Sequence, residues 1–153
     1  MINEKWKDIE GFEGSYQISN FGRVKSLKRT IEETNQYNSI FYLELEEKIK
    51  KPQMGRNGYL HVCLCKNSKK KTFRIHRLVA KNFLKNYKEE LDVNHKDCNK
   101  QNNRVDNLEM VSRKENIRHA WKNNLCEKVR EASKKNIKKA TQIRMQKRRL
   151  ENE

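Results

Sequence analysis

The sequence has little of what a membrane-spanning or secreted protein needs. It contains one proline and five glycines in 153 residues, only 8% aromatic residues and only 34% hydrophobic residues. No apolar run approaches the roughly 18 residues of a transmembrane helix, and the N-terminal residues lack the apolar centre of a signal peptide. Neither a membrane span nor secretion is indicated, and a cytoplasmic location is expected. The modest apolar content suits one small domain or two very small ones.

The cysteines are few and scattered. They are Cys63, Cys65, Cys98 and Cys126. A four-cysteine zinc site needs closely spaced pairs, and a reducing compartment favours free thiols over disulfides, so neither is expected. Cys63 and Cys65 lie two apart in an expected strand and therefore share a face, where we expect them to fill space between apolar side chains.

Positive charge is abundant and unevenly distributed. The 36 Lys and Arg residues against 20 Asp and Glu give a net charge of +16. Such a surplus favours nucleic acid as a partner, with a membrane surface as the weaker alternative. Residues 31–49 are acidic and are expected to face away from the polyanion, whereas the end of the chain, from residue 127, holds ten Lys or Arg against four Glu.

Turn residues and hydrophobic periodicity divide the chain into four segments. Residues 1–30 are expected to form short strands, residues 31–57 a variable linker or insertion that is irregular or poorly ordered up to residue 52, and residues 123–153 a basic helical or disordered arm. In residues 58–122 we first expect a hairpin of residues 59–64 and 72–76 with a lysine-rich turn, and then a short helix.

The chemistry is concentrated in residues 91–121. Two short strands, near residues 91–97 and 107–111, enclose a polar loop, and Ser112 with Glu115 forms a capping box that predicts a helix from Ser112 to about residue 121. This strand–loop–strand–helix unit is expected to bring His95 and Asn116 toward one point.

The polar residues of this unit suit hydrolysis of a phosphodiester. Neutral His95 is able to accept a proton from water, and the amides of Asn94 and Asn116, with Asp97 or Asp106, offer oxygens to a hard divalent cation. A cation beside a general base supports phosphodiester hydrolysis. The alternative stays open at this point, because a single histidine is often structural and asparagines commonly serve turns and caps.

Four motifs carry a family resemblance: HRLVA at 76–80, VNHKD at 93–97, NNRVDNLE at 102–109 and ENIRHA at 115–120. Together they resemble the HNH endonuclease family, in the form found in phage and intron-encoded homing endonucleases. Residues 6–29 resemble a nuclease-associated modular domain of the fourth class. The resemblance implies an α+β fold with a small N-terminal β-rich module, a ββα-metal nuclease core and a basic C-terminal helical arm.

The same resemblance implies an activity and residue roles. The protein would be a metal-dependent DNA endonuclease that hydrolyses double-stranded DNA with Mg²⁺ or Mn²⁺ and no small-molecule cofactor, in the cytoplasm of a bacterial host if phage-encoded. His95 would be the general base, Asn107 would orient or polarise the water, and Asn116 would bind the metal with Asn94 as partner ligand. The family often has Asp or His at position 94 and His at position 116. His76, in HRLVA, is expected to pack rather than to bind metal.

DNA binding is expected from basic side chains in three places: the N-terminal strands, the hairpin and the arm. The residues are Arg23, Lys25, Lys69, Lys70, Lys71, Arg74, Arg77, Lys134, Lys135, Lys138, Lys139 and Arg148. Contacts to phosphates would position the protein without reading the base sequence. The sequence does not indicate an oligomeric state.

Two other classes of protein remain open. A DNA-binding protein that keeps the fold without cleaving would show salt-dependent binding and no metal-dependent product. An RNA-binding module would prefer single-stranded RNA to duplex DNA, but the sequence offers little exposed aromatic patterning for base stacking.

The basic arm generates a first prediction. Truncation of the chain before Glu127 should lower the affinity for DNA and flatten its dependence on salt, because counterion release follows the number of phosphate contacts. Binding titrations of the full chain and the truncated chain over a range of salt concentrations measure both quantities. An unchanged slope would show that the arm does not touch phosphates.

Overall fold

The computed structural model describes residues 3–123 and residue 144. The chain divides into two compact units, Met1–Ser112 and Arg113–Glu153. The expected DNA contacts at Lys134, Lys135, Lys138, Lys139 and Arg148, and with them the expected structure of the arm, lie outside the described residues. In the part of the chain that is described, no helix is long and apolar enough to span a membrane.

An antiparallel sheet in the order β1-β2-β3-β6 begins the first unit. Its strands are β1 Trp6–Asp8, β2 Tyr16–Ser19, β3 Val24–Ser26 and β6 Lys48–Lys50. Alternation of apolar and polar residues places Tyr16 and Ile18 on a buried face, as the sequence predicts. The turn between β2 and β3 contains Gly22 with φ of +80°, a conformation that glycine adopts without strain.

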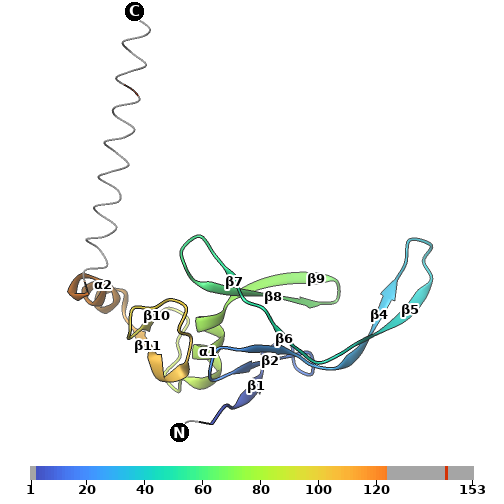
Figure 1. The fold of residues 1–153 in the computed structure, drawn as a ribbon, viewed down its shortest axis with the longest axis horizontal. Coiled ribbons are helices and arrows are strands. Elements are labelled where there is room, and N and C mark those ends of the chain that lie inside the picture. Colours follow the sequence, from blue (N-terminus) through green and yellow to red (C-terminus); the bar gives the residue numbers. More distant parts are fainter. Residues whose placement is uncertain (1–2, 124–143, 145–153) are drawn as a thin grey trace, which may run out of the picture. The chain divides into compact units, whose positions relative to one another are not determined.

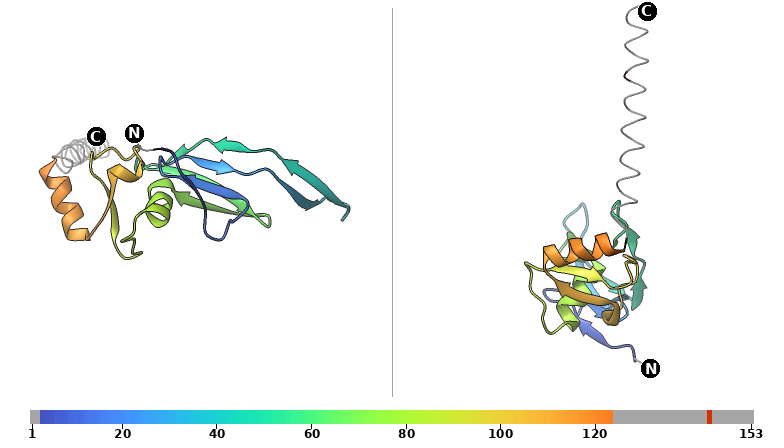
Figure 2. Two further views of the ribbon diagram at one scale, coloured as in Figure 1. Left: turned by 90° about the horizontal axis from the view of Figure 1, so that it is seen from below. Right: turned by 90° about the vertical axis from the view of Figure 1, so that its left-hand side faces the viewer.

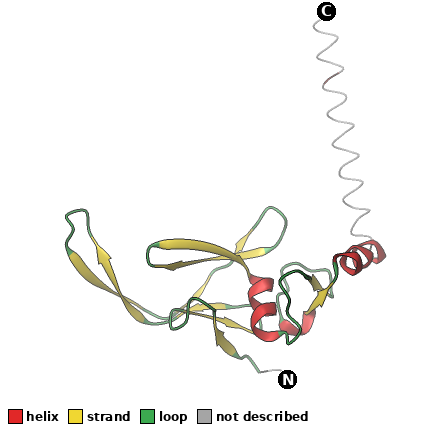
Figure 3. Ribbon diagram, turned by 180° about the vertical axis from the view of Figure 1, so that it is seen from behind, coloured by secondary structure: helices red, strands yellow, loops and turns green. Residues whose placement is uncertain are grey.

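A second, two-stranded sheet corrects an expectation. Residues 31–52 are not irregular: β4, Arg29–Thr34, pairs with β5, Ile40–Leu45, over six residue pairs, and β6 follows. The hairpin extends beyond the four-stranded sheet (Figures 1 and 3). Cross-strand pairs such as Ile31 with Leu43 stabilise the hairpin locally. The acidic composition of the segment gave no sign of this pairing, which is why an irregular segment was expected.

A third sheet carries the expected hairpin. It has the order β7-β8-β9, with β7 Gln53–Met54, β8 Leu60–Lys66 and β9 Lys69–Arg74. The turn is shorter than expected: only Asn67 and Ser68 lie between the strands, both with positive φ, so the lysines from Lys69 belong to β9. Such a two-residue turn matches the twist of the flanking strands.

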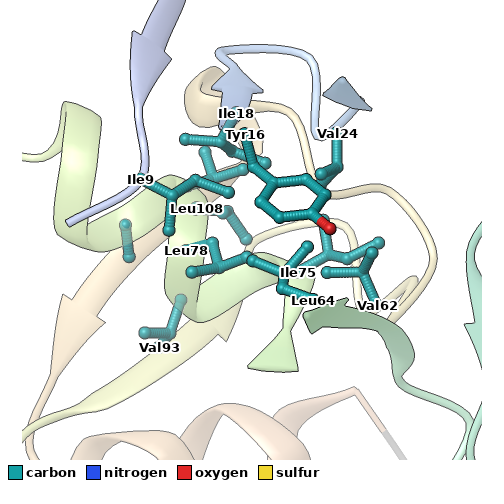
Figure 4. Packing of buried hydrophobic residues seen from close by; sticks show 12 residues of the cluster. Ile9, Tyr16, Ile18, Val24, Val62, Leu64, Ile75, Leu78, Val93 and Leu108 are labelled. Carbon is teal, nitrogen blue, oxygen red and sulfur yellow. The ribbon is translucent and has the colours of Figure 1, made fainter. Parts of the chain in front are cut away.

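The expected helix after the hairpin is α1, Ile75–Phe83. It begins at Ile75, so the last two residues of the predicted strand, Ile75 and His76, belong to the helix. It contacts β2, β8, β9, β10 and β11. Figure 2 shows α1 in green among these strands, and Figure 4 shows the core that they form. The strongly buried members include Ile18, Leu64, Val79 and Leu108. The members of this cluster lie between Ile9 and Leu108, so elements from both ends of the first unit share one core.

The last strands are β10, Asp92–His95, and β11, Leu108–Val111, with a 3₁₀ turn at Val105–Asn107 before β11. They pair antiparallel, as the sequence predicts. The second unit begins with α2, Arg113–Lys122, which confirms the helix expected after the capping box. The proposed boundaries of the four segments stay a prediction.

Cys63, Cys65 and Cys98 are free thiols, as expected. Cys63 and Cys65 share a face of β8, but this face is less buried than the face of Val62 and Leu64. The two cysteines therefore flank the core rather than fill it.

Candidate active site

The β10–β11 pair places His95 at the end of a strand, with Asn94 beside it. Val93 and Leu108 anchor the pair in the core, and the register sets Asn94 opposite Glu109 and His95 opposite Leu108. Successive residues of a strand point to opposite faces, so Asn94 and His95 leave the strand in different directions. Both are buried: the residues are 7% and 4% exposed.

Aromatic rings pack against His95. The ring of His76, on α1, lies 5.3 Å from the His95 ring between centroids, in an edge-on arrangement, and the ring of Tyr59 lies 6.0 Å away. Tyr59 also contacts His76, at 4.7 Å, and carries the Lys100 ammonium over its ring at 4.8 Å. These contacts confirm that His76 packs, as the sequence predicts; whether it binds metal is a separate question.

This packing keeps both histidines neutral. Burial lowers the pKa of His95, although the hydrogen bond with Asn103 and the charge of Asp97 oppose the shift. Burial, with the neighbouring His95 and Arg74, lowers the pKa of His76 to about 3. His76 Nδ1 is buried without a hydrogen-bond partner, which adds to the cost of charging the ring. A neutral imidazole is the form that accepts a proton.

Asn103 contacts the edge of His95. His95 Nε2 lies 3.1 Å from Asn103 Oδ1, and Asn103 Nδ2 donates to the carbonyl of Gln101 at 3.3 Å. Asn103 is 4% exposed, so this contact is shielded from water.

Asn107 holds the loop between the two strands. Its Oδ1 accepts from the Asp97 amide at 3.1 Å, and its Nδ2 donates to Asp97 Oδ1 at 2.9 Å and to the Asn102 carbonyl at 2.8 Å. The observed role is therefore structural, and the water contact expected of Asn107 stays a prediction. Asp97 and Asp106 are also used locally: Asn102 donates to Asp97 Oδ2 at 2.6 Å, and Asp106 pairs with Arg104 at 3.0 Å.

Asn94 has a polar partner across the sheet. Asn94 Nδ2 donates to Glu109 Oε1 at 2.8 Å. Because the amide nitrogen is bound to Glu109, the amide oxygen is the atom of Asn94 that would coordinate a cation. Amide and carboxylate oxygens are donors that Mg²⁺ and Mn²⁺ accept, so this pair fits a hard cation. Within residues 3–123, no group of three or more His, Cys, Asp or Glu side chains forms a metal site.

Asn116 and His119 lie on α2, in the second unit. The site as described in the first unit therefore contains His95, Asn94 and Asn107, whereas the predicted contribution of Asn116 belongs to the other unit and stays a prediction.

The expected DNA-binding residues differ in their surroundings. Lys69, Lys70, Lys71 and Arg74 are exposed on β9. Arg77 is partly buried and donates to the carbonyl of Leu91 at 3.3 Å. The contacts of these residues with DNA stay a prediction.

The two N-terminal basic residues are already paired. Arg23 forms an ion pair with Glu4, and Lys25 lies 3.4 Å from Glu47 and 4.6 Å from the centroid of the Trp6 ring. Contact with a phosphate would have to compete with these partners.

Sequence reasoning missed Tyr59, Asn103 and Glu109. Asn103 and Glu109 lie within the NNRVDNLE motif, which the sequence analysis used only for Asn107. Glu109 could have been found from the strand register, since the residue opposite Asn94 follows once the two strands are aligned. Tyr59 lies far from His95 in sequence and gives no local signal.

Comparison with known proteins identifies the family to which the chain belongs. The HNH endonuclease family matches residues 73–118, and the NUMOD4 motif matches residues 4–65. DNA endonuclease I-HmuI of Bacillus phage SP01 is 42% identical over 113 residues, which cover 74% of this chain and 55% of that protein. The uncharacterized HNH endonuclease L245 of Acanthamoeba polyphaga mimivirus is 40% identical over 121 residues, which cover 79% of this chain and 31% of the relative.

A solved structure agrees with these sequence relatives. The structure that describes DNA binding and cleavage by the HNH homing endonuclease I-HmuI matches with a TM-score of 0.63 and 38% identity, over 86% of this chain and 68% of that one. The chain belongs to the HNH homing endonuclease family, and its α+β fold is the fold of that family. It spans about half the length of the phage relative and about a third of the mimiviral one.

Buried His76 generates a prediction about stability. Its pKa falls from 6.5 in the unfolded chain to about 3 in the folded protein. Between pH 6.5 and about pH 3 the unfolded state therefore binds more protons than the folded state does. The free energy of unfolding should fall as the pH is lowered through this window, by up to about 1.4 kcal/mol per pH unit from this one group. His76→Phe, which keeps a ring but cannot titrate, should flatten this slope.

Urea unfolding at a series of pH values across this window measures the slope for the wild type and for His76→Phe. His119→Phe, which changes a histidine of α2 outside the core cluster, is the matched control. Equal slopes in the wild type and His76→Phe would contradict the prediction.

Proposed function

We propose that the chain is a metal-dependent endonuclease that hydrolyses phosphodiester bonds in double-stranded DNA, with His95 as the general base. One observation carries the proposal: a buried histidine whose pKa is lowered by burial lies at the end of β10, next in sequence to a buried asparagine amide, in a chain of the HNH homing endonuclease family. A buried titratable group with a lowered pKa in such a site is a candidate for acid–base chemistry.

The proton transfer follows from the state of His95. The neutral ring takes a proton from a water molecule as the water oxygen attacks the phosphorus, and the bond from phosphorus to the leaving sugar oxygen breaks. His76 and Tyr59 cover His95, so this environment is drier than bulk water, and a neutral base is maintained at physiological pH.

A divalent cation, Mg²⁺ or Mn²⁺, would be held by the amide oxygen of Asn94 together with Asn116. When bound, it would neutralise charge on the scissile phosphate and the leaving oxygen. Asn94 is neutral, but its amide donates to the carboxylate of Glu109. Glu109 would therefore place negative charge one hydrogen bond behind the proposed ligand Asn94 and fix the direction of the Asn94 oxygen.

Duplex DNA is the proposed substrate. The relative I-HmuI is described as binding and cleaving DNA, and this chain carries a net charge of +16. Lys69, Lys71 and Arg74 on exposed β9 provide cations for phosphates, and the basic residues from position 127 onward would add more. These contacts would supply affinity, whereas sequence preference must come from contacts to bases.

A second candidate is a DNA-binding protein that no longer cleaves. The observation that favours it is the pair of neutral amides, Asn94 and Asn116, at positions proposed for the metal. Neutral ligands bind a divalent cation less tightly than carboxylates do. Salt-dependent binding without metal-dependent cleavage would identify this case.

His95→Ala should abolish cleavage and leave DNA binding nearly intact. Loss of a general base costs about 10² to 10⁴ in rate, whereas the side chain is buried and contributes little to phosphate contacts. The assay incubates a pool of supercoiled plasmids carrying random inserts with the wild type and the variant, in Mg²⁺, in Mn²⁺ and in EDTA. Conversion to open-circle or linear DNA measures cleavage, and gel retardation measures binding.

The random inserts are included because a single plasmid could lack a rare target sequence and would then stay uncut even by an active enzyme. Metal-dependent cleavage by the wild type alone is the expected result. Cleavage retained by His95→Ala would reject the role of His95, and retardation of DNA without cleavage by any protein would favour the second candidate.

Glu109→Gln should weaken metal binding, and so raise the metal concentration needed for cleavage, by removing the charge behind Asn94. Mutations of residues that support metal ligands typically cost about 10- to 100-fold in metal affinity or activity. Calorimetric titration of Mn²⁺ into the free protein measures affinity, and the Mn²⁺ concentration for half-maximal cleavage gives a second value. Glu44→Gln, on the exposed β5 strand, removes the same charge elsewhere. Equal Mn²⁺ affinities in the two variants would exclude a role for Glu109.

A further inference from the structure

The N-terminal region contacts the loop that joins β10 to β11 at three successive positions within the first unit. The carbonyl of Asn20 accepts from the Val105 amide at 2.9 Å. The Phe21 ring lies under the Arg104 guanidinium at 4.2 Å. Gly22 lies so close to Asn103 that an added Cβ would be 2.8 Å from Asn103 Cβ and 3.1 Å from its carbonyl oxygen. The turn between β2 and β3 is therefore packed directly against the residues that precede β11.

Asn103 lies between this turn and His95. Its Nδ2 donates to the Gln101 carbonyl at 3.3 Å, which orients the amide so that Oδ1 faces His95. An amide oxygen only accepts hydrogen bonds, so the Nε2 atom of His95, 3.1 Å away, must carry the hydrogen. In a neutral imidazole the other nitrogen, Nδ1, then holds the lone pair.

We propose that Asn103 is a positioning residue that selects the His95 tautomer with Nδ1 unprotonated, and that the turn Asn20–Gly22 holds Asn103 in place. This inference rests on the proposed function, because the selected tautomer matters only if His95 accepts a proton. It gives the N-terminal region a part in catalysis that is separate from any contact with DNA.

The burial of the contact explains how a single amide selects a tautomer. Asn103 and His95 are each 4% exposed, so water does not replace a lost partner readily. In the other tautomer the proton is on Nδ1, so the lone pairs of His95 Nε2 and Asn103 Oδ1 would face each other. A buried hydrogen bond would then be unmade, which costs more free energy than the bond itself contributes. The turn is itself anchored, since the side chain of Asn20 accepts from the Lys5 amide at 2.7 Å and donates to the Asn3 carbonyl at 3.1 Å.

Two substitutions of similar shape separate the acceptor from the packing. Asn103→Leu removes the oxygen, whereas Asn103→Asp keeps an acceptor toward His95. Long-range ¹H–¹⁵N correlation spectra of histidine-labelled protein without metal distinguish protonated from unprotonated ring nitrogens, and His95→Gln assigns the His95 signals. We expect Nε2–H in the wild type and Asn103→Asp, and a mixture of tautomers or Nδ1–H in Asn103→Leu.

The cleavage assay adds a kinetic readout. Asn103→Leu should lower the single-turnover rate by about 10- to 100-fold with nearly unchanged DNA affinity, and Asn103→Asp should restore most of the rate. An unaltered tautomer in Asn103→Leu, or Nδ1–H in the wild type, would overturn the proposal. The spectra decide this even if the wild type does not cleave, whereas cleavage by His95→Ala would reject the proposed function independently.

Two glycines provide a matched test of the turn. Gly22 and Gly11 have φ of +80° and +78°, so alanine is similarly strained at both, but only at Gly22 would its Cβ meet Asn103; nothing lies within 4 Å at Gly11. Gly22→Ala should alter the His95 tautomer signals and lower the cleavage rate more than Gly11→Ala does, with thermal unfolding confirming that both fold. Identical spectra and rates in the two variants would remove the turn from the proposal.

Discussion

Burial of α1 is the constraint on which the first unit depends. Val79 and Ala80 are fully buried, and the helix meets strands from three sheets, so the apolar faces of these three sheets are covered by the same helix. A small chain with few hydrophobic residues gains enough buried area only by pooling the apolar faces of several short elements. One consequence is that His76, two residues into α1, is fixed against His95 by the same packing that folds the unit.

Much of this fold could be predicted from the sequence because its signals are local. Alternation at Val62 and Leu64 predicts β8, and the capping residues Ser112 and Glu115 predict the start of α2. His95 is a candidate from its residue type alone, and its predicted place at the end of a strand is confirmed.

Other features depend on contacts that no local pattern encodes. In β5 the run from Ile40 to Leu43 is apolar at every position and exposed, so the alternation of a strand is hidden, and pairing with β4 defines it instead. The shorter hairpin turn follows from positive φ at Asn67 and Ser68, which the neighbouring lysines obscured. The neutral state of His95 depends on tertiary burial, and Tyr59 reaches it only through the fold.

The three-position contact between the β2–β3 turn and the loop that joins β10 to β11 also bears on how members of this family exchange parts. A segment that only bound DNA would be transferable between relatives as an independent cassette. Here Gly22 leaves no room for a side chain against Asn103, and the Asn20 carbonyl is committed to Val105. An N-terminal region taken from one relative would therefore fit the β10–β11 region of another only where both surfaces match, so a change at Gly22 or Asn103 in one region requires a compensating change in the other.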